Sequence, residues 1–295
     1  MSSVDPHPTT EARSILDGTA MRIVSAQGAQ DKLEARLYTP HAEGRSSHDS
    51  GLIVFFPYGG FIAVDLDECD GFARMLAART GWRVLISSYT LPAARPFPAA
   101  AEDAHAVLKW AVRNRMRLGW DGRRLITGGI EAGGNLAAVS ALMARDRAGP
   151  MLTAQLLIMP MLDPGLTSCS MRSVAGQDGA ARAADACAAG YRDYLPRALD
   201  RTHPYACPLQ SSRMKGLPPA LILSADDDPL RDEAEQYGAK LAAAGIRTML
   251  KRLPPIALED PDARCSTVRK ENALQEMAAF IAGLDAPLTT PKKSA

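Results

Sequence analysis

Short apolar runs alternate with longer amphipathic stretches from Gly51 onward. The runs are continuously apolar, too short for helices and bounded by Gly, Pro or Asp, which is typical of strands buried on both faces of a sheet. These predicted strands span residues 52–56, 84–86, 124–127, 155–158 and 220–224. Apolar spacing of three and four residues predicts helices at 72–80, 99–118, 134–147 and 232–244. The alternation predicts an α/β fold, with a central, mostly parallel sheet and helices on both faces.

The length and composition indicate a single domain. A chain of 295 residues with 46% hydrophobic content can bury one large core, which we assign to residues 46–164 and 206–285 of a domain spanning 1–285. Residues 1–45, with an N-terminal helix, and 165–205 do not fit the alternation, so we expect them to form a small helical cap over the carboxyl ends of the strands. The Pro- and Lys-containing tail at 286–295 is predicted to be disordered.

Charge and cysteine content exclude several classes of function. The 34 basic and 33 acidic residues leave a net charge of +1. The sequence has no stripe of basic residues interleaved with aromatics, so we expect no nucleic-acid partner. The first ten residues are polar, and no window approaches the roughly eighteen uninterrupted apolar residues of a membrane span, so we expect a cytoplasmic protein with no membrane partner. The 5 cysteines are widely spaced without CxxC pairs. They indicate neither a disulfide framework nor a zinc site, and we expect no metal and no cofactor.

The segment 127–135, Thr-Gly-Gly-Ile-Glu-Ala-Gly-Gly-Asn, lies between a predicted strand and a predicted helix. It is a nucleophile-elbow sequence with Glu131 in place of the central serine. In a GxSxG elbow the central residue occupies the apex of a sharp turn, so the residues two places away must be nearly free of side chain, as Gly129 and Gly133 are. A carboxylate cannot replace the alkoxide of serine-type acyl transfer, although carboxylates act as nucleophiles in other displacement reactions.

Further motifs resemble the bacterial hormone-sensitive-lipase family of α/β-hydrolase-fold esterases, from about residue 51 to 283. Residues 54–61, Val-Phe-Phe-Pro-Tyr-Gly-Gly-Phe, resemble the HGGG oxyanion segment of that family, and Tyr89 followed by Pro-Phe-Pro-Ala-Ala at 96–100 resembles its YRLAPEHPFPAA stretch. The segment 228–233 is nearly identical to the family motif DPLRDE, whose first aspartate is the acid of the catalytic triad. The resemblance implies an α/β-hydrolase fold, a carboxylesterase or lipase ancestry and the acid role for Asp228.

The departures from the family pattern coincide with the catalytic positions. Glu131 replaces the nucleophilic serine, and only Gly59 and Gly60 remain of the oxyanion glycines. In the family a histidine follows the last strand, and the matching stretch 254–260 places Leu258 there. A serine esterase needs a nucleophile, a base, an acid and oxyanion donors. With Glu131, Asp228 and Leu258 at the former triad positions, we expect no serine-esterase activity.

The carboxylates of Glu131 and Asp228 are expected to converge, because the missing histidine bridges these positions in the family. Three interpretations stay open: an acid/base pair with split pKa values, a hard-cation site that includes Glu259 or Asp260, or neutralisation by an arginine. The sequence favours the arginine, and Arg231, close to Asp228, is the expected partner. The Asp-rich run 226–228 is not spaced like a metal loop.

The function most consistent with these substitutions is non-catalytic. We expect a pseudoenzyme that binds a small apolar or carbonyl-containing ligand beneath the cap, or that regulates through such a ligand. The ring of Tyr58 is expected to line or fill the pocket or to hydrogen-bond the ligand, while backbone N–H groups of the glycines face it. The predicted ligand-binding residues are Tyr58, Gly59, Gly60, Glu131, Ala132, Asp228 and Leu258.

Two alternatives belong to other classes of function. Glu131 could act as general base or nucleophile in a non-serine enzyme, such as a lyase, isomerase or decarboxylase. A purely structural or protein-partner role would instead fill the pocket with Tyr58, Leu258 and cap side chains. The resemblance also implies a homodimer that pairs through an edge strand.

Overall fold

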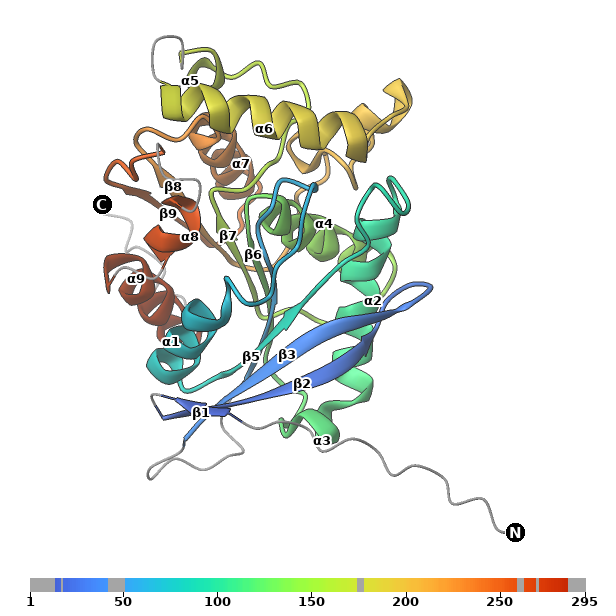
Figure 1. Cartoon of the computed structure of the whole chain (residues 1–295), viewed down its shortest axis with the longest axis vertical. Helices are drawn as coiled ribbons and strands as arrows, with labels where there is room; N and C mark the ends of the chain where they lie inside the picture. The colour runs from blue at the N-terminus through green and yellow to red at the C-terminus, as the bar shows by residue number, and fades with distance from the viewer. Residues whose placement is uncertain are drawn as a thin grey trace, which may run out of the picture.

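A computed structural model describes residues 14–16, 18–41, 51–173, 178–258, 263–268 and 271–285. Its centre is a sheet with the strand order β1-β2-β3-β5-β4-β6-β7-β8-β9 (Figure 1). The strands β3, β2 and β1 are antiparallel to their neighbours, and the pairs from β5 through β9 are parallel. The prediction of a mostly parallel α/β sheet is therefore confirmed. The strands are β1 (Ser14–Leu16), β2 (Thr19–Gln27), β3 (Lys32–Pro40), β4 (Leu52–Phe56), β5 (Arg83–Ser87), β6 (Leu125–Ile130), β7 (Ala154–Ile158), β8 (Ala220–Ala225) and β9 (Thr248–Leu253).

Helices cover both faces of the sheet, as the sequence predicted. On one face α1 packs against α9, and on the other α2 packs against α4, with α7 beside β8 (Figure 1). Gly119 and Gly245, which follow the ends of α3 and α7, both have positive φ angles, of 75° and 78°. The helices outside the cap are α1 (Asp70–Thr80), α2 (Ala99–Arg113), α3 (Arg115–Leu118), α4 (Ala132–Asp146), α7 (Arg231–Ala243), α8 (Ala263–Val268) and α9 (Glu271–Ala282), with short 3-10 turns η2 (Pro208–Gln210) and η3 (Gly283–Asp285).

The hydrophobic core consists of two clusters, one on each face of the sheet. Successive side chains of a strand point to opposite faces. In β4, Leu52, Val54 and Phe56 therefore join one cluster, while Ile53 and Phe55 join the other. All five are fully buried. This two-sided burial is why the predicted strands are continuously apolar rather than alternating.

The expectation of a cap from residues 1–45 is wrong for the described part of that span. Residues 14–16, 19–27 and 32–40 are strands that extend the sheet, and residues 1–13, 17 and 42–45 lie outside the described residues. The reason is visible in β3, where buried Leu33, Ala35 and Leu37 alternate with Glu34 and Arg36. A period of two indicates a strand with one covered face.

The insertion between β7 and β8 contains α5 (Cys169–Arg172), α6 (Asp178–Tyr194) and η1 (Ala198–Thr202). The long helix α6 lies over the ends of β6 and β7 (Figure 1). The tail at 286–295, predicted to be disordered, lies outside the described residues.

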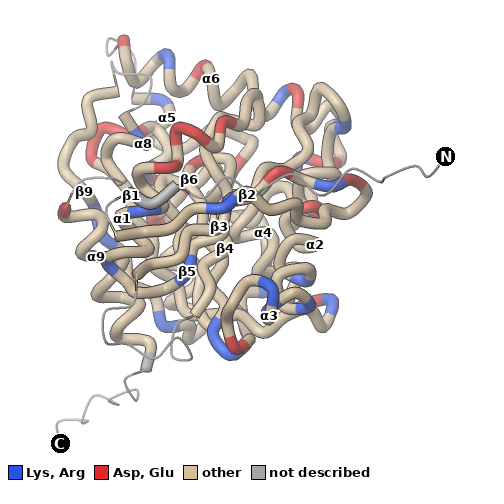
Figure 2. Tube along the Cα trace, turned by 60° about the horizontal axis from the view of Figure 1, so that its bottom comes forward, with Lys and Arg blue, Asp and Glu red and all other residues tan. Residues whose placement is uncertain are grey.

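Charged residues of both signs are interspersed along the described trace (Figure 2). This distribution matches the near balance of 34 basic and 33 acidic residues. Among the described helices, none combines the length and the apolar character needed to cross a membrane.

Candidate functional site

Glu131 occupies the turn between β6 and α4 with φ 56° and ψ −114°, a left-handed conformation that glutamate rarely adopts. The flanking glycines make this turn sterically feasible. A Cβ on Gly129 would lie 2.1 Å from the carbonyl oxygen of Gly133, and a Cβ on Gly133 would lie 2.0 Å from that of Phe56. The elbow geometry predicted from the GxExG sequence is therefore present.

The carboxylate of Glu131 lies against the glycine loop that follows β4. Its Oε2 accepts hydrogen bonds from the backbone N–H groups of Gly59 and Gly60, both at 2.9 Å. The loop glycines have φ angles of 130° and 60°, which aim successive N–H groups at one point. These N–H groups were expected to face a ligand, and in the structure an oxygen of this same chain accepts both of them.

Arg264 of α8 joins Glu131 to Asp228. Its Nη1 donates to Oε1 of Glu131 at 2.7 Å, while Nε and Nη2 donate to the two oxygens of Asp228 at 2.8 and 3.0 Å. All three residues are buried, with exposures of 8% for Arg264, 6% for Glu131 and 2% for Asp228. Burial lowers the pKa of Arg264, but the two carboxylates outweigh that effect and hold it well above its usual value.

An arginine therefore pairs with both carboxylates, but it is not the expected one. Arg231 pairs with its neighbour Asp232 at 3.1 Å and donates to the carbonyl oxygen of Asp226 at 2.7 Å. Besides Arg264, Oδ1 of Asp228 accepts the backbone N–H of Leu230 at 2.8 Å. Sequence proximity was thus a misleading guide to the ion-pair partner.

Leu258, which the sequence analysis assigned to the position of the histidine, has an apolar side chain and forms no bridge between Glu131 and Asp228. Its side chain is buried, 9% exposed, in the apolar cluster that contains Ile256 and Met277. The bridging role between residues 131 and 228 falls instead to Arg264. Sequence reasoning missed Arg264 because it lies beyond the matched family turn, on a short helix without a motif of its own.

The other predicted ligand-binding residues, Tyr58, Ala132 and Asp228, contact different parts of the structure. The hydroxyl of Tyr58 forms a hydrogen bond with Glu68, and its ring is partly buried against the apolar cluster of Leu258. Ala132 is fully buried as the first residue of α4. Asp228 also borders a cavity of about 220 Å³ that is lined by Ser170, Ser173, Asp226, Asp227, Arg231 and Pro255.

An aromatic cluster lies between the glycine loop and the cap helix α6. The ring of Phe61 stacks on that of Tyr194 with centroids 3.9 Å apart, and lies 6.3 Å from both Tyr89 and Tyr191. The hydroxyls of Tyr89, Tyr191 and Tyr194 are buried and have no hydrogen-bond partner among the described residues. Burial raises the pKa of each, so the hydroxyls stay neutral.

Further buried polar groups surround the ion-paired centre. Burial raises the pKa of the Cys187 thiol on α6, although Arg264 nearby lowers it. Burial raises the pKa of Glu233 of α7 well above its usual value. The carboxyl group of Glu233 accepts hydrogen bonds from the backbone N–H groups of Leu162 and Asp163 at 3.0 and 3.1 Å. Within the described ranges, no group of three or more His, Cys, Asp or Glu residues is arranged to hold a metal ion. Residues 259 and 260, considered as cation ligands, lie outside those ranges.

Comparisons with known proteins agree with this architecture. A family model described as alpha/beta hydrolase fold matches residues 53–256. The chain is 34% identical to Esterase LipI of Mycobacterium tuberculosis over 230 residues, which is 77% of this chain and 71% of that protein. It is 35% identical over 208 residues to Carboxylesterase NlhH of the same species, covering 69% of this chain but only 64% of NlhH. The solved structure of an esterase from the archaeon Pyrobaculum calidifontis matches with a TM-score of 0.80 and 31% identity, over 90% of this chain and 84% of the other.

The chain belongs to the α/β-hydrolase-fold family. Within it, the chain is a member of the hormone-sensitive-lipase group to which the mycobacterial esterases belong, as the sequence motifs predicted.

Proposed function

We propose that this protein is a non-hydrolytic member of its esterase family, whose former catalytic centre is closed by the buried ion-pair network of Glu131, Arg264 and Asp228. The observation that carries the proposal is the position of the Glu131 carboxylate. Its Oε2 takes both backbone donors of the glycine loop at 2.9 Å, and its Oε1 takes Nη1 of Arg264 at 2.7 Å.

Each step of serine-type hydrolysis lacks a group in this arrangement. Position 131 offers no hydroxyl to attack an ester. Arg264, which bridges to the acid Asp228, carries only donors and cannot take a proton, so it cannot serve as the base. The donors that would stabilise a tetrahedral oxyanion already bind a carboxylate. Nucleophile, base and oxyanion site are thus all replaced or occupied.

The alternative, in which Glu131 is the general base or nucleophile of another reaction, has less support. Both carboxylate oxygens accept charged or backbone hydrogen bonds. To abstract a proton or attack a substrate, the carboxylate would have to leave Arg264 or the glycine loop. A buried charge separated from its partners is costly.

The hydrolytic test uses purified full-length protein with p-nitrophenyl acetate and butyrate. We expect release of p-nitrophenol at the rate of buffer alone, equal for the parent and for Glu131→Gln, because no group can generate the nucleophile. LipI, assayed in parallel, serves as the active relative. Turnover well above buffer that disappears in Glu131→Gln or Glu131→Ala would establish the enzymatic alternative instead.

For the non-catalytic role, we propose the binding of a small, largely apolar molecule beneath α6. A carbonyl ligand at Gly59 and Gly60 would have to displace Glu131, so the aromatic cluster is the better-supported contact surface. Its three unpaired hydroxyls, on Tyr89, Tyr191 and Tyr194, support a molecule with at least one polar atom, because an unsatisfied buried hydroxyl costs about 1–3 kcal/mol.

Native mass spectrometry of protein purified without added ligand tests this role. We expect a retained small molecule whose occupancy falls in the triple variant Tyr89→Phe, Tyr191→Phe, Tyr194→Phe, since only hydrogen-bonding groups are removed. The spectrum of the acid-denatured sample provides the mass of the unliganded chain. A native mass equal to that of the unliganded chain would favour the structural role, in which the cap side chains themselves fill the pocket.

A further inference from the structure

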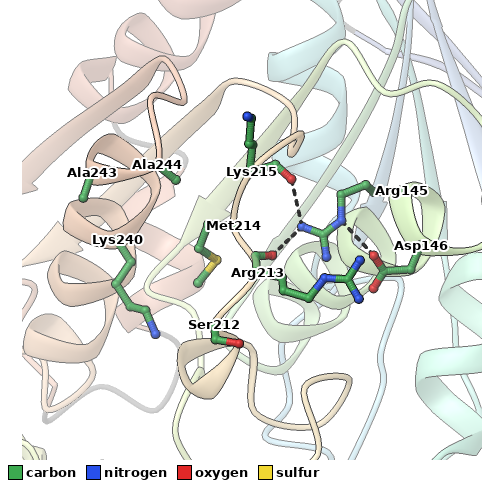
Figure 3. A pocket seen from close by; sticks show the side chains of 9 residues that line it. All are labelled: Arg145, Asp146, Ser212, Arg213, Met214, Lys215, Lys240, Ala243 and Ala244. Carbon is green, nitrogen blue, oxygen red and sulfur yellow. Dashed lines mark hydrogen bonds and ion pairs between the residues drawn. The ribbon is translucent and has the colours of Figure 1, made fainter.

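A second cavity lies away from the former catalytic centre, between α4, the segment 212–215 and α7 (Figure 3). Its volume is about 770 Å³. Glu131 immediately precedes α4, whereas Arg145 and Asp146 of this cavity lie at the other end of the helix. At 1.5 Å per residue the two places are about 20 Å apart. The residues that line the cavity are Arg145, Asp146, Ser212, Arg213, Met214, Lys215, Lys240, Ala243 and Ala244.

The charge of this lining is strongly one-sided. Arg145, Arg213, Lys215 and Lys240 contribute four positive charges, and Asp146 contributes the one negative charge, so 4 − 1 leaves an excess of three. The whole chain has a net charge of only +1. Such an excess in a concave site attracts anions and raises their local concentration.

The only carboxylate of the lining is already engaged. Oδ1 of Asp146 accepts Nε of Arg145 at 2.8 Å, and Oδ2 accepts the hydroxyl of Tyr205 at 3.1 Å. The hydrogen bond from Arg145, partly offset by burial, lowers the pKa of Asp146 and keeps it ionised. Asp146 therefore pairs with Arg145, and its charge also interacts with that of Arg213. Lys240 donates to the carbonyl oxygen of Leu209 at 2.6 Å. With a single carboxylate, the lining keeps its excess of three positive charges.

Arg145 also shapes the wall of the cavity. Its Nη1 donates to the backbone carbonyl oxygens of Arg213 and, at 3.3 Å, Lys215. These bonds hold the segment 212–215 by its backbone. The side chain of Arg213 extends toward Arg145 and Asp146, while that of Lys215 extends in another direction (Figure 3). Between them, Met214 is buried at 4% exposure and, with Ala243 and Ala244, contributes apolar surface.

Helix stabilisation explains only part of this arrangement. Cations in the last turn of a helix interact favourably with its dipole, which accounts for Arg145 at the end of α4 and Lys240 near the end of α7. Arg213 and Lys215 belong to the connecting segment, where no helix end requires them. Both side chains are exposed at the mouth of the cavity, where an anion from solution can reach them.

We propose that this cavity binds a small soluble organic anion, in which a phosphate or carboxylate group is carried on an apolar body. Arginine and lysine side chains are the usual partners of such oxyanions, through forked and point-charge contacts respectively. The apolar body would lie on Met214, Ala243 and Ala244. The site is independent of the proposed function, because none of its lining residues belongs to the Glu131–Arg264–Asp228 network.

Titration calorimetry at low salt with 1-naphthyl phosphate tests the proposal. We expect binding that is weakened about tenfold or more in Arg213→Ala/Lys215→Ala, since charged hydrogen bonds are removed. The control Lys109→Ala/Arg113→Ala removes two exposed cations from α2 and should leave the affinity unchanged. Neutral 1-naphthol and inorganic phosphate should each bind more weakly than 1-naphthyl phosphate, because each lacks one half of the recognised ligand.

Several results would overturn the proposal. These are the absence of binding by 1-naphthyl phosphate, equal affinity for 1-naphthol or inorganic phosphate, and an equal loss in the control variant. Co-sedimentation with vesicles containing phosphatidic acid separates a soluble anion from a lipid headgroup. Vesicle binding that is lost in Arg213→Ala/Lys215→Ala would replace the soluble ligand with a membrane surface.

Discussion

Glu131 combines a strained backbone with a fully engaged side chain. Its φ of 56° belongs to the conformation that an elbow imposes, and its carboxylate bonds two backbone N–H groups and a guanidinium. The sequence predicted the turn, the approach of Asp228 and neutralisation by an arginine. It could not identify Arg264, because a long side chain on a separate helix reaches partners that no local pattern indicates.

The network makes a prediction about stability. Arg264→Ala would leave Glu131 and Asp228 buried without a counter-charge, so we expect the free energy of unfolding to fall by about 3–5 kcal/mol. Adding Glu131→Gln should recover part of this loss, because one of the two uncompensated charges disappears. Urea denaturation followed by circular dichroism measures both effects.

The matched control for this prediction is an exposed arginine in a comparable pair. Arg252 contacts Glu235 at 2.7 Å, but 49% of its side chain is exposed. Arg252→Ala should therefore lower the free energy of unfolding much less than Arg264→Ala does, because solvent screens an exposed ion pair. If Arg264→Ala costs no more than Arg252→Ala, the buried network does not have the structural role assigned to it.

At the scale of elements, the spacing of hydrophobic residues predicted the strands and helices reliably. The five predicted strands correspond to β4 through β8, and the predicted helices to α1, α2 with α3, α4 and α7. The sequence analysis missed the N-terminal strands because it searched for continuously apolar runs. β3 is covered on one face only, so buried and exposed residues alternate along it. The contact of α6 with the glycine loop depends on a close approach of the two backbones at Gly190 and Gly60. The spacing of hydrophobic residues in the sequence does not predict such a contact.

The close approach of α6 supplies a prediction at the element scale. A Cβ on Gly190 would lie 1.7 Å from the carbonyl oxygen of Gly60, so Gly190→Ala must displace α6 from the loop. We expect lower stability, although alanine favours a helix over glycine by about 1 kcal/mol at an unobstructed position. We also expect faster alkylation of Cys187, a residue of α6 whose side chain is fully buried.

Peptide-level mass spectrometry after iodoacetamide treatment measures the alkylation of Cys187 separately from the other cysteines. Asp185→Ala, on the exposed side of the same helix, is the control and should leave the rate unchanged. Equal alkylation rates of Cys187 in Gly190→Ala and the parent protein would show that the helix tolerates the side chain without moving.

At the scale of the whole molecule, strand order brings the site together. Glu131 follows β6 and Asp228 follows β8, and both strands run parallel to β7 between them, so the two residues reach the same edge of the sheet. The same order leaves β9 at one edge of the described sheet. Pairing of two copies through an edge strand stays a prediction from the family resemblance.

The sequence by itself determined the fold and the family, because hydrophobic period, glycine requirements and motif order are local properties of the chain. Which residues occupy the catalytic positions of the family stays a prediction from those motifs. The tertiary structure decided which arginine joins Glu131 to Asp228, that the carboxylate takes the oxyanion donors, and that a cationic cavity lies at the far end of α4. These are contacts between segments remote in sequence, and their geometry arises only when the sheet brings the segments together.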